Sequence, residues 1–300
     1  MPKDDEVFEA FEPAIAAREG GTPWDLKGAE RRYVSDLDLL AELIAIPVQA
    51  GHGQASGRLA KGIDAWCASE LRRAAFDPDE VWPRLTRPRV LPRDVADLLA
   101  GLPDALRGQV MEHVLRNRKV APTEARVLGR VFVKQADVLI AQWSRGAELL
   151  ISTKSMLSSF GNNLRNRFEE SYGDAKNLRG RFPLLSLGFL YLLRSTILEE
   201  PANWELALDM LRKLREDADG YDATGLILAD WSDQNFAGVT INQGAVPEDL
   251  RVDQLLATLI ARTLERTPVQ FHVRARELRD GREVPVEEGV QPGEAAEDDA

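Results

Sequence analysis

The sequence predicts an α/β protein in which a mixed β-sheet is flanked by helices and preceded by a helical region. Residues 1–100 contain helix-period segments, among them SDLDLLAELIAI (35–46) with Ser35 as an N-cap and RLAKGIDAWCASELRRAAF (58–76). Strand-like runs begin near residue 129 and then alternate with helix-period segments as far as residue 266. Such alternation is typical of a sheet covered by helices.

The individual elements follow from period and turn residues. Proline-rich residues 77–103 interrupt regular structure, and PDALRGQVMEHVLRNR (103–118) begins a helix. LLSLGFLYLLRSTIL (184–198) is apolar on all sides, so it is either a central strand or a buried helix. The remaining expected elements are strands at 129–143, 146–156, 225–231 and 239–243, and helices at 162–178, 204–217 and 248–266.

Three regions are expected: a helical N-terminal region (1–100), a core (101–276) and an acidic, disordered tail (277–300). The chain has no 18-residue apolar run, and its first residues do not resemble a signal peptide, so we expect a soluble, cytoplasmic protein. The single cysteine, Cys67, excludes an internal disulfide and a cysteine-based zinc site, and we expect it to be a packing residue.

The charge is unevenly distributed. The formal net charge is −11, but residues 277–300 carry nine acids against two arginines, whereas residues 107–194 carry fifteen Lys/Arg against seven Asp/Glu. A local basic field attracts phosphates whatever the global sum, so the middle of the chain favours a nucleic-acid partner. A solvated surface rich in arginine is the alternative interpretation.

Common nucleotide and metal motifs are missing. There is no G-x-x-x-x-G-K-[ST] and no strand-linked G-x-G-x-x-G. The three histidines, His52, His113 and His272, have no metal-ligand spacing, so we expect each to be structural or exposed. These absences argue against nucleotide-binding folds, histidine-metal nucleases and histidine-based hydrolases.

A hairpin is expected to bring three polar residues together. If Arg145 and Gly146 form a two-residue turn, Asp137 opposes Lys154, and Leu139 opposes Ser152, while a bulged turn would shift this register by one. Asp137, Ser152 and Lys154 would then share one side of the open end. Glu148 lies about 13 Å of strand from Ser152, near Trp143 at the closed end, and cannot share an ion with Asp137.

The following helix offers a second acid. With Leu164, Phe168, Tyr172 and Ala175 on the apolar face, Glu169 lies about 105° from the centre of that face and borders the sheet. Glu170 is expected to point into solvent. Asp174, on the other flank, is a weaker candidate.

The order of these elements resembles the PD-(D/E)XK nuclease core over about residues 105–265. In that core an aspartate begins one strand, x-x-Lys ends its hairpin partner, and a helix follows. Ser152 stands where this family usually has an acid, and Ala136 where it often has proline. The type II restriction endonucleases that cut sites with a CCGG core show a similar Ser-x-Lys, with a glutamate supplied by the following helix. Here that residue would be Glu169.

The resemblance implies a restriction-endonuclease-like fold and Mg²⁺-dependent, sequence-specific cleavage of double-stranded DNA by a homodimer or homotetramer. It implies that Asp137 and Glu169 ligate Mg²⁺, with the Thr153 carbonyl as a further ligand. Lys154 would position the attacking water and stabilise charge, and Ser152 would mark the place of the displaced acid. Glu70 or Glu112 would assist a second metal ion.

The segment SMLSSFGNNLRNR (155–167) is suited to DNA contact, because hydroxyl and amide groups gather at a helix N-terminus beside two arginines. The candidates are Ser158, Ser159, Asn162, Asn163, Arg165 and Arg167. A capped helix start, with Asn162 or Asn163 as the N-cap, is the alternative. For the whole chain, a structural ion pair between Asp137 and Lys154, a non-catalytic DNA-binding or scaffold protein, and an RNA-directed or nicking nuclease also stay open.

Overall fold

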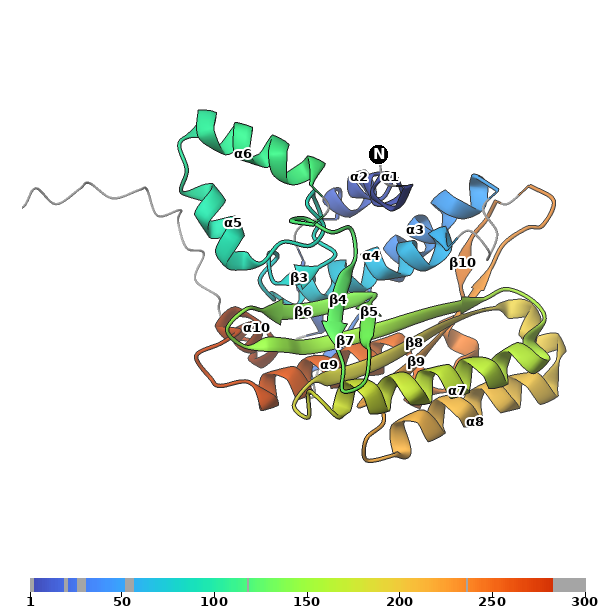
Figure 1. Ribbon diagram of the computed structural model, residues 1–300. Helices are drawn as coiled ribbons and strands as arrows, with labels where there is room; N and C mark the ends of the chain where they lie inside the picture. Colours follow the sequence, from blue (N-terminus) through green and yellow to red (C-terminus); the bar gives the residue numbers. More distant parts are fainter. Residues whose placement is uncertain are drawn as a thin grey trace, which may run out of the picture.

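The computed structural model describes residues 3–18, 21–25, 31–51, 57–117, 119–235 and 237–282. Within these residues, six strands form a mixed sheet in the order β10-β9-β8-β7-β6-β3 (Figure 1). They are β3 (Val81–Trp82), β6 (Val138–Gln142), β7 (Gly146–Met156), β8 (Ser186–Arg194), β9 (Ala223–Asp230) and β10 (Thr240–Ile241). Neighbours β7, β8 and β9 are parallel, and the other pairs are antiparallel. The prediction of a mixed α/β sheet is confirmed.

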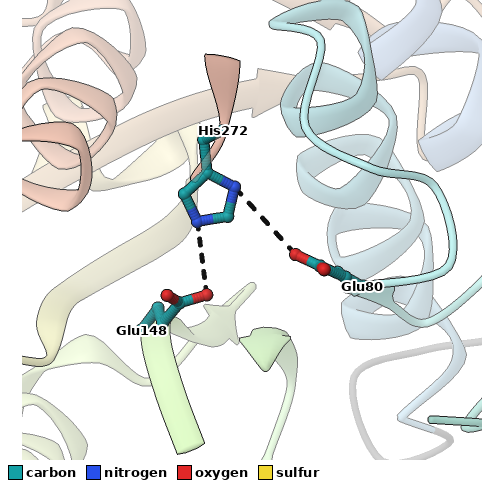
Figure 2. A group of neighbouring side chains, drawn as sticks. All are labelled: Glu80, Glu148 and His272. Atoms are coloured by element: carbon teal, nitrogen blue, oxygen red, sulfur yellow. Dashed lines mark hydrogen bonds and ion pairs between the residues drawn. The ribbon is translucent and has the colours of Figure 1, made fainter. Parts of the chain in front are cut away.

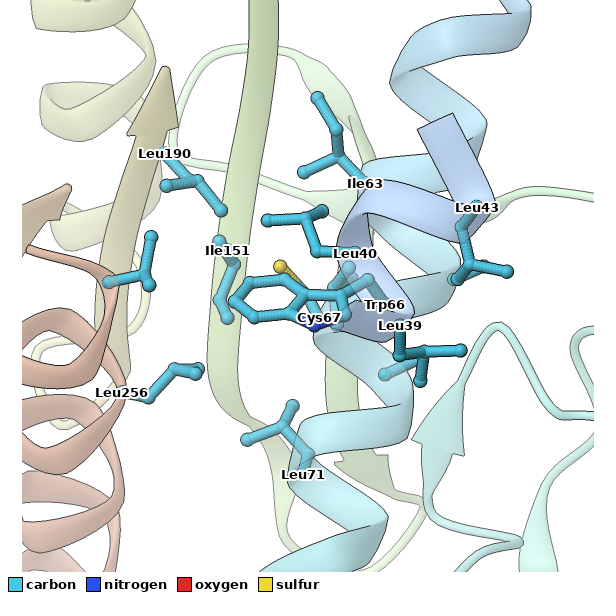
Figure 3. Close-up of a cluster of buried hydrophobic side chains, with 14 of the residues drawn as sticks. Leu39, Leu40, Leu43, Ile63, Trp66, Cys67, Leu71, Ile151, Leu190 and Leu256 are labelled. Atoms are coloured by element: carbon cyan, nitrogen blue, oxygen red, sulfur yellow. The ribbon is translucent and has the colours of Figure 1, made fainter. Parts of the chain in front are cut away.

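Helices cover both faces of the sheet. On one face, α3 (Leu37–Gln49), α4 (Arg58–Arg73) and α9 (Val252–Arg266) pack in one apolar core, where Trp66 and Cys67 meet Ile151 of β7 (Figure 3). On the other face, α7 (Phe160–Arg179) and α8 (Pro201–Glu216) form a second core with Leu150. Cys67 is therefore a buried packing residue, as expected.

Residues 184–198, for which the sequence allowed either a central strand or a buried helix, contain the strand β8. This strand pairs with β7 on one side and β9 on the other, and its residues 186–193 are all buried. Continuous apolar sequence is typical of a parallel strand that is covered on both faces.

The remaining elements lie around this sheet. They are α1 (Lys3–Glu9), α2 (Glu12–Ala16), β1 (Trp24–Asp25), β2 (Arg32–Tyr33), α5 (Arg93–Ala100), α6 (Asp104–Arg116), β4 (Ala125–Leu128), β5 (Val133–Ala136) and α10 (Val273–Asp280), with short 3-10 helices η2 (Ser195–Glu199), η3 (Gln243–Ala245) and η4 (Glu248–Leu250). No helix in the described ranges is long and apolar enough to span a membrane.

Two expected boundaries differ from the observed elements. β3 comes from the region expected to be separate and helical, yet Val81 pairs with Ile140 of β6, so residues before 100 contribute to the main sheet. The helix α10 continues to Asp280 with Ala275 buried, past the residue at which the tail was expected to begin. Residues 52–56, with His52, and 283–300 lie outside the described chain.

The register of the β6–β7 hairpin differs from the one expected. The pairs are Val138↔Ile151 and Leu139↔Leu150, so the predicted pairing of Leu139 with Ser152 is wrong. The turn consists of the three residues 143–145, and a β-bulge between Ile140 and Ala141 leaves Glu148 as the extra residue of β7. Together these features shift the pairing by two residues. Continued by one step, the register places Asp137 opposite Ser152 rather than Lys154.

Candidate functional sites

Asp137 lies at the open end of the hairpin, between β5 and β6. Its carboxylate accepts a hydrogen bond of 3.0 Å from the backbone N–H of Thr153. Because the N–H and C=O of a strand residue point toward the same neighbour, the Thr153 carbonyl faces this edge of β7 as well. The structure therefore brings Asp137, Ser152 and Thr153 together.

Lys154 is paired with an acid of the following helix. Its Nζ lies 3.3 Å from Oε1 of Glu170, and Arg167 donates a further hydrogen bond to the same carboxylate. Burial acts against ionisation of Glu170, but Lys154 and Arg167 outweigh it and hold the pKa of this carboxyl below its usual value. Lys154, Glu170 and Arg167 thus form one charged group on the α7 side of the sheet.

Glu170, expected to point into solvent, is exposed but also pairs with Lys154, whereas Glu169, expected to border the sheet, does not contact Lys154. Glu169 is exposed and forms no hydrogen bond or ion pair with another described residue. The predicted apolar face included Tyr172, but Tyr172 is 39% exposed and its hydroxyl donates to Asp217. Ser171 is buried instead, so the packed face is rotated toward Glu170.

Tyr221 is buried on the α7 side of the sheet. Its hydroxyl is buried next to Ser152 and donates to the Ser171 carbonyl at 3.1 Å. Burial raises the pKa of Tyr221, and the negative charges of Asp174, Asp137 and Glu170 raise it further. All three acids therefore lie close enough to influence one buried phenol. Asp174 itself is paired with Lys134.

A further acid, which was not among the sequence-based candidates, approaches from α4. The Thr153 hydroxyl donates to the carboxylate of Asp64, and Lys61 lies 3.4 Å from Asp64 and 3.7 Å from Glu124. Burial raises the pKa of Asp64 to about 7; the Lys61 ammonium opposes this shift and the Asp137 carboxylate adds to it. Its position in the apolar run GIDAWCA (62–68) was the sequence signal, since an ionisable group on a buried helix face needs partners.

The acids expected to assist a second metal ion have other partners. Glu70 is buried and accepts hydrogen bonds from the Tyr33 hydroxyl at 2.9 Å and from Arg73. Glu112 is exposed and pairs with Arg116 on the same helix. Neither contacts Asp137, Thr153 or Lys154. Lys61, Glu124 and Asp137 instead line a common surface pocket with Ala125 and Ala136.

The expected DNA-contact segment begins α7 two residues earlier than predicted. Ser159 is the N-cap, with a left-handed backbone (φ 58°) and no side-chain cap bond, so neither asparagine caps the helix. Ser158, Ser159 and Arg165 are exposed. Asn163 donates to the Ser159 carbonyl at 2.8 Å, while Arg167 is engaged by Glu170. The side chain of Asn162 lies outside the described part of the chain.

A second group lies at the closed end of the hairpin, where Glu80, Glu148 and His272 converge (Figure 2). The Nε2 atom of His272 is 3.2 Å from Glu148, and its Nδ1 atom is 4.0 Å from Glu80. Each residue offers one ligand atom, and these atoms lie within 4.8 Å of one another, so the group could bind a metal ion. No sequence pattern indicates this group, because the three residues are far apart along the chain and Glu148 turns inward only through the bulge.

Arg145 already neutralises much of this second group. Its guanidinium lies 2.6 Å from Glu80 and 2.8 Å from Glu148, and packs over the ring of Phe271. His272 and Arg145 hold the pKa of Glu148 below its usual value in spite of its burial. A metal ion would therefore have to bind beside a fixed positive charge, and the contacts present attach His272, which precedes α10, to Glu148 of the sheet.

Comparison of the chain with models of known protein families, with curated proteins and with solved structures finds no match.

Proposed function

We propose that this protein is a Mg²⁺-dependent endonuclease that hydrolyses phosphodiester bonds of double-stranded DNA at the open end of the β6–β7 hairpin. The observation that carries the proposal is that Asp137 accepts a hydrogen bond from the Thr153 backbone while the next residue, Lys154, is paired with Glu170, at the ends of two adjacent strands. The three elements there follow in the order of the nuclease core that the sequence resembles.

The donor set fits a magnesium ion. Mg²⁺ prefers oxygen ligands and is commonly held by one or two carboxylates together with substrate phosphates. Asp137 and Glu170 would supply carboxylates and Thr153 a carbonyl, with Glu170 in the role that the sequence pattern predicts for Glu169. The ion would supply Lewis-acid stabilisation of the developing negative charge.

The chain's own residues have separable roles in this proposal. The Lys154 ammonium would orient the attacking water and stabilise negative charge on the phosphate oxygens. The water oxygen would bond to phosphorus and release a proton to solvent as the bond to the leaving oxygen breaks, and the leaving oxygen would take up a proton from solvent. Arg167 would keep Glu170 oriented, because it donates to the same carboxylate as Lys154.

A type II restriction enzyme of the cytoplasm, acting as a homodimer or homotetramer on a specific sequence, is the setting that the resemblance favours. The net positive charge of residues 107–194 supports a nucleic-acid substrate, because the proposed site lies within that stretch. Asp64 is a further acid within reach of Thr153 and could serve as an additional ligand when it is ionised.

The test uses the adjacent acids of α7 as a matched pair. Supercoiled plasmid is incubated with Mg²⁺ and wild type, Asp137→Asn, Lys154→Ala, Glu170→Gln or Glu169→Gln, all purified in parallel. Wild type and Glu169→Gln should cut at similar rates, whereas the other three should be slower by about 100-fold or more, as when a charge-stabilising group is removed.

The contrary results differ in meaning. Equal cutting by all variants would remove this site from the reaction. If Glu169→Gln is slow and Glu170→Gln is normal, the helix acid is Glu169 after all. Should wild type leave the plasmid intact with both Mg²⁺ and Mn²⁺, the nuclease proposal fails, and a non-catalytic DNA-binding protein becomes the better interpretation.

A further inference from the structure

The antiparallel ribbon of β4 and β5 carries an unusual set of exposed side chains. We define the ribbon as residues 125–136; its strands pair Arg126 with Gln135 and Leu128 with Val133. Arg126, Leu128, Val133 and Gln135 are exposed on one face, and Val131 is 80% exposed at the tip. The outer surface of the ribbon is thus cationic, amide-bearing and apolar, and its sequence ARVLGRVFVKQA contains no acid.

The ribbon tip is held rigidly although its side chains face solvent. The side chain of Asn177, on α7, accepts hydrogen bonds from the N–H groups of Val131 (2.8 Å) and Phe132 (3.2 Å) and donates to the Phe132 carbonyl. A side chain at Gly129 would drive its Cβ into the Asn177 amide, so the close approach requires glycine there. Exposed apolar groups that are fixed in this way indicate a contact surface rather than a loose loop.

The exposed arginines have charge available for a partner. The guanidinium groups of Arg126 and Arg130 form no hydrogen bond or ion pair with the other described residues. Glu124, the residue directly before the ribbon, accepts a hydrogen bond from Gln135 and forms an ion pair with Lys61. The surface therefore complements a partner that combines negative charge with apolar groups.

The base of the ribbon adjoins the proposed active site. Asp137 follows Ala136 directly, and Ala125 and Ala136 line the same pocket as Asp137. The strands of the ribbon run across β6 and β7 rather than alongside them (Figure 1). A partner held on the ribbon would thus extend past the open end of the hairpin.

We propose that the β4–β5 ribbon is a DNA-contacting element that enters a groove of the double helix and holds the duplex across the Asp137 site. This inference rests on the proposed function, and it names the surface that would bind the substrate. A two-stranded ribbon fits the major groove, where arginines reach phosphates or guanine edges and apolar side chains contact thymine methyl groups.

The test measures binding separately from cutting. Affinity for a fluorescently labelled duplex is determined by anisotropy in EDTA over a range of salt concentrations. The variants are Arg126→Gln with Arg130→Gln, and Val131→Ser with Phe132→Ser. The matched control is Arg262→Gln with Arg274→Gln, which removes the same charge from exposed positions on α9 and α10.

The two ribbon variants should differ in a characteristic way. Removal of both arginines should weaken binding about tenfold or more and lower the slope of log Kd against log salt by about two, one for each phosphate that is no longer neutralised. Removal of the apolar tip should weaken binding with the slope unchanged. The control should bind within about twofold of wild type, since its arginines lie outside the proposed interface.

Several results would overturn the ribbon proposal: wild-type affinity in both ribbon variants, equal weakening in the control, no duplex binding by wild type, or a dimer that the tip variant dissociates while DNA affinity is kept.

Plasmid cutting is scored independently. If wild type cuts and the ribbon variants bind and cut like it, only the ribbon proposal fails. If wild type binds through the ribbon but never cuts, the ribbon stands and the nuclease proposal fails.

Discussion

Asp64 should make the stability of this protein fall as pH rises, because its carboxyl is buried and its pKa is raised to about 7 from an ordinary value of 3.8. Between these values the folded state keeps a proton that the unfolded state has released. Stability decreases with pH wherever the folded state binds more protons, so the decrease runs from about pH 4 to about pH 7 and is complete above that window. The substitution Asp64→Asn removes the ionisable carboxyl and therefore this decrease in stability.

The size of the effect follows from the shift. One pKa unit corresponds to about 1.4 kcal/mol, so about three units set an upper limit of about 4 kcal/mol for the whole window. Roughly two of these units lie above pH 5, so wild type should become less stable by about 2–3 kcal/mol between pH 5 and pH 8. Asp64→Asn should lack this decrease, so its stability relative to wild type should rise by that amount.

Urea unfolding followed by circular dichroism, in EDTA at about pH 5 and about pH 8, gives the required free energies. The quantity compared is the stability difference between variant and wild type, because other titrating groups cancel in it. Asp38→Asn is the control, because it removes the same kind of carboxyl from an exposed position on α3. An equal difference for Asp64→Asn at both values would show that Asp64 ionises normally and that its environment has been misjudged.

Three further predictions concern other parts of the chain. Arg145→Gln should raise the affinity of the Glu80–Glu148–His272 group for Zn²⁺ about tenfold or more by calorimetry, since a fixed positive charge beside the ion is removed; an affinity that the substitution leaves unchanged would show that any bound ion lies away from Arg145. Glu148→Gln should flatten the decrease of stability at acid pH, because a lowered pKa gives stability that disappears as pH falls below about 4.5; identical acid unfolding curves would contradict it. Asn177→Ala should cost about 2–3 kcal/mol and speed amide exchange at residues 131–132, since buried hydrogen bonds are removed; unchanged exchange would show that the ribbon turn is held by other contacts.

The sheet was predictable because its signals are local. β7 begins and ends at the predicted residues, 146 and 156. The apolar run around β8 was compatible with a strand or a helix, and only its pairing with β7 and β9 identifies it as a central strand. Short elements carried no such signal. β3 has two residues and joins the sheet by pairing with β6 over a long sequence separation, and the ribbon strand β4 has four.

The candidate site was harder to predict because it depends on register and on the rotation of one helix. No sequence pattern indicates the bulge at Glu148. Because the bulge shifts the register, the pairing beyond it cannot be derived from the turn alone. The rotation of α7 was misjudged because Tyr172 is amphipathic and bonds Asp217, while the polar Ser171 and Asp174 are buried. Both errors concern tertiary partners that hydrophobic periodicity does not contain.

The two corrections act together on the proposed chemistry. The shifted register moves Asp137 from Lys154 to Ser152, the position at which the nuclease core that the sequence resembles usually has an acid. The rotated helix brings Glu170 to Lys154, so that a carboxylate still reaches the strand position beyond Ser152. In the nuclease proposal, Asp137 opposite Ser152 and Glu170 beside Lys154 would together replace the acid that the strand lacks at Ser152. The comparison of Glu170→Gln with Glu169→Gln tests this arrangement directly, since the two acids are adjacent in sequence and differ in whether they reach Lys154.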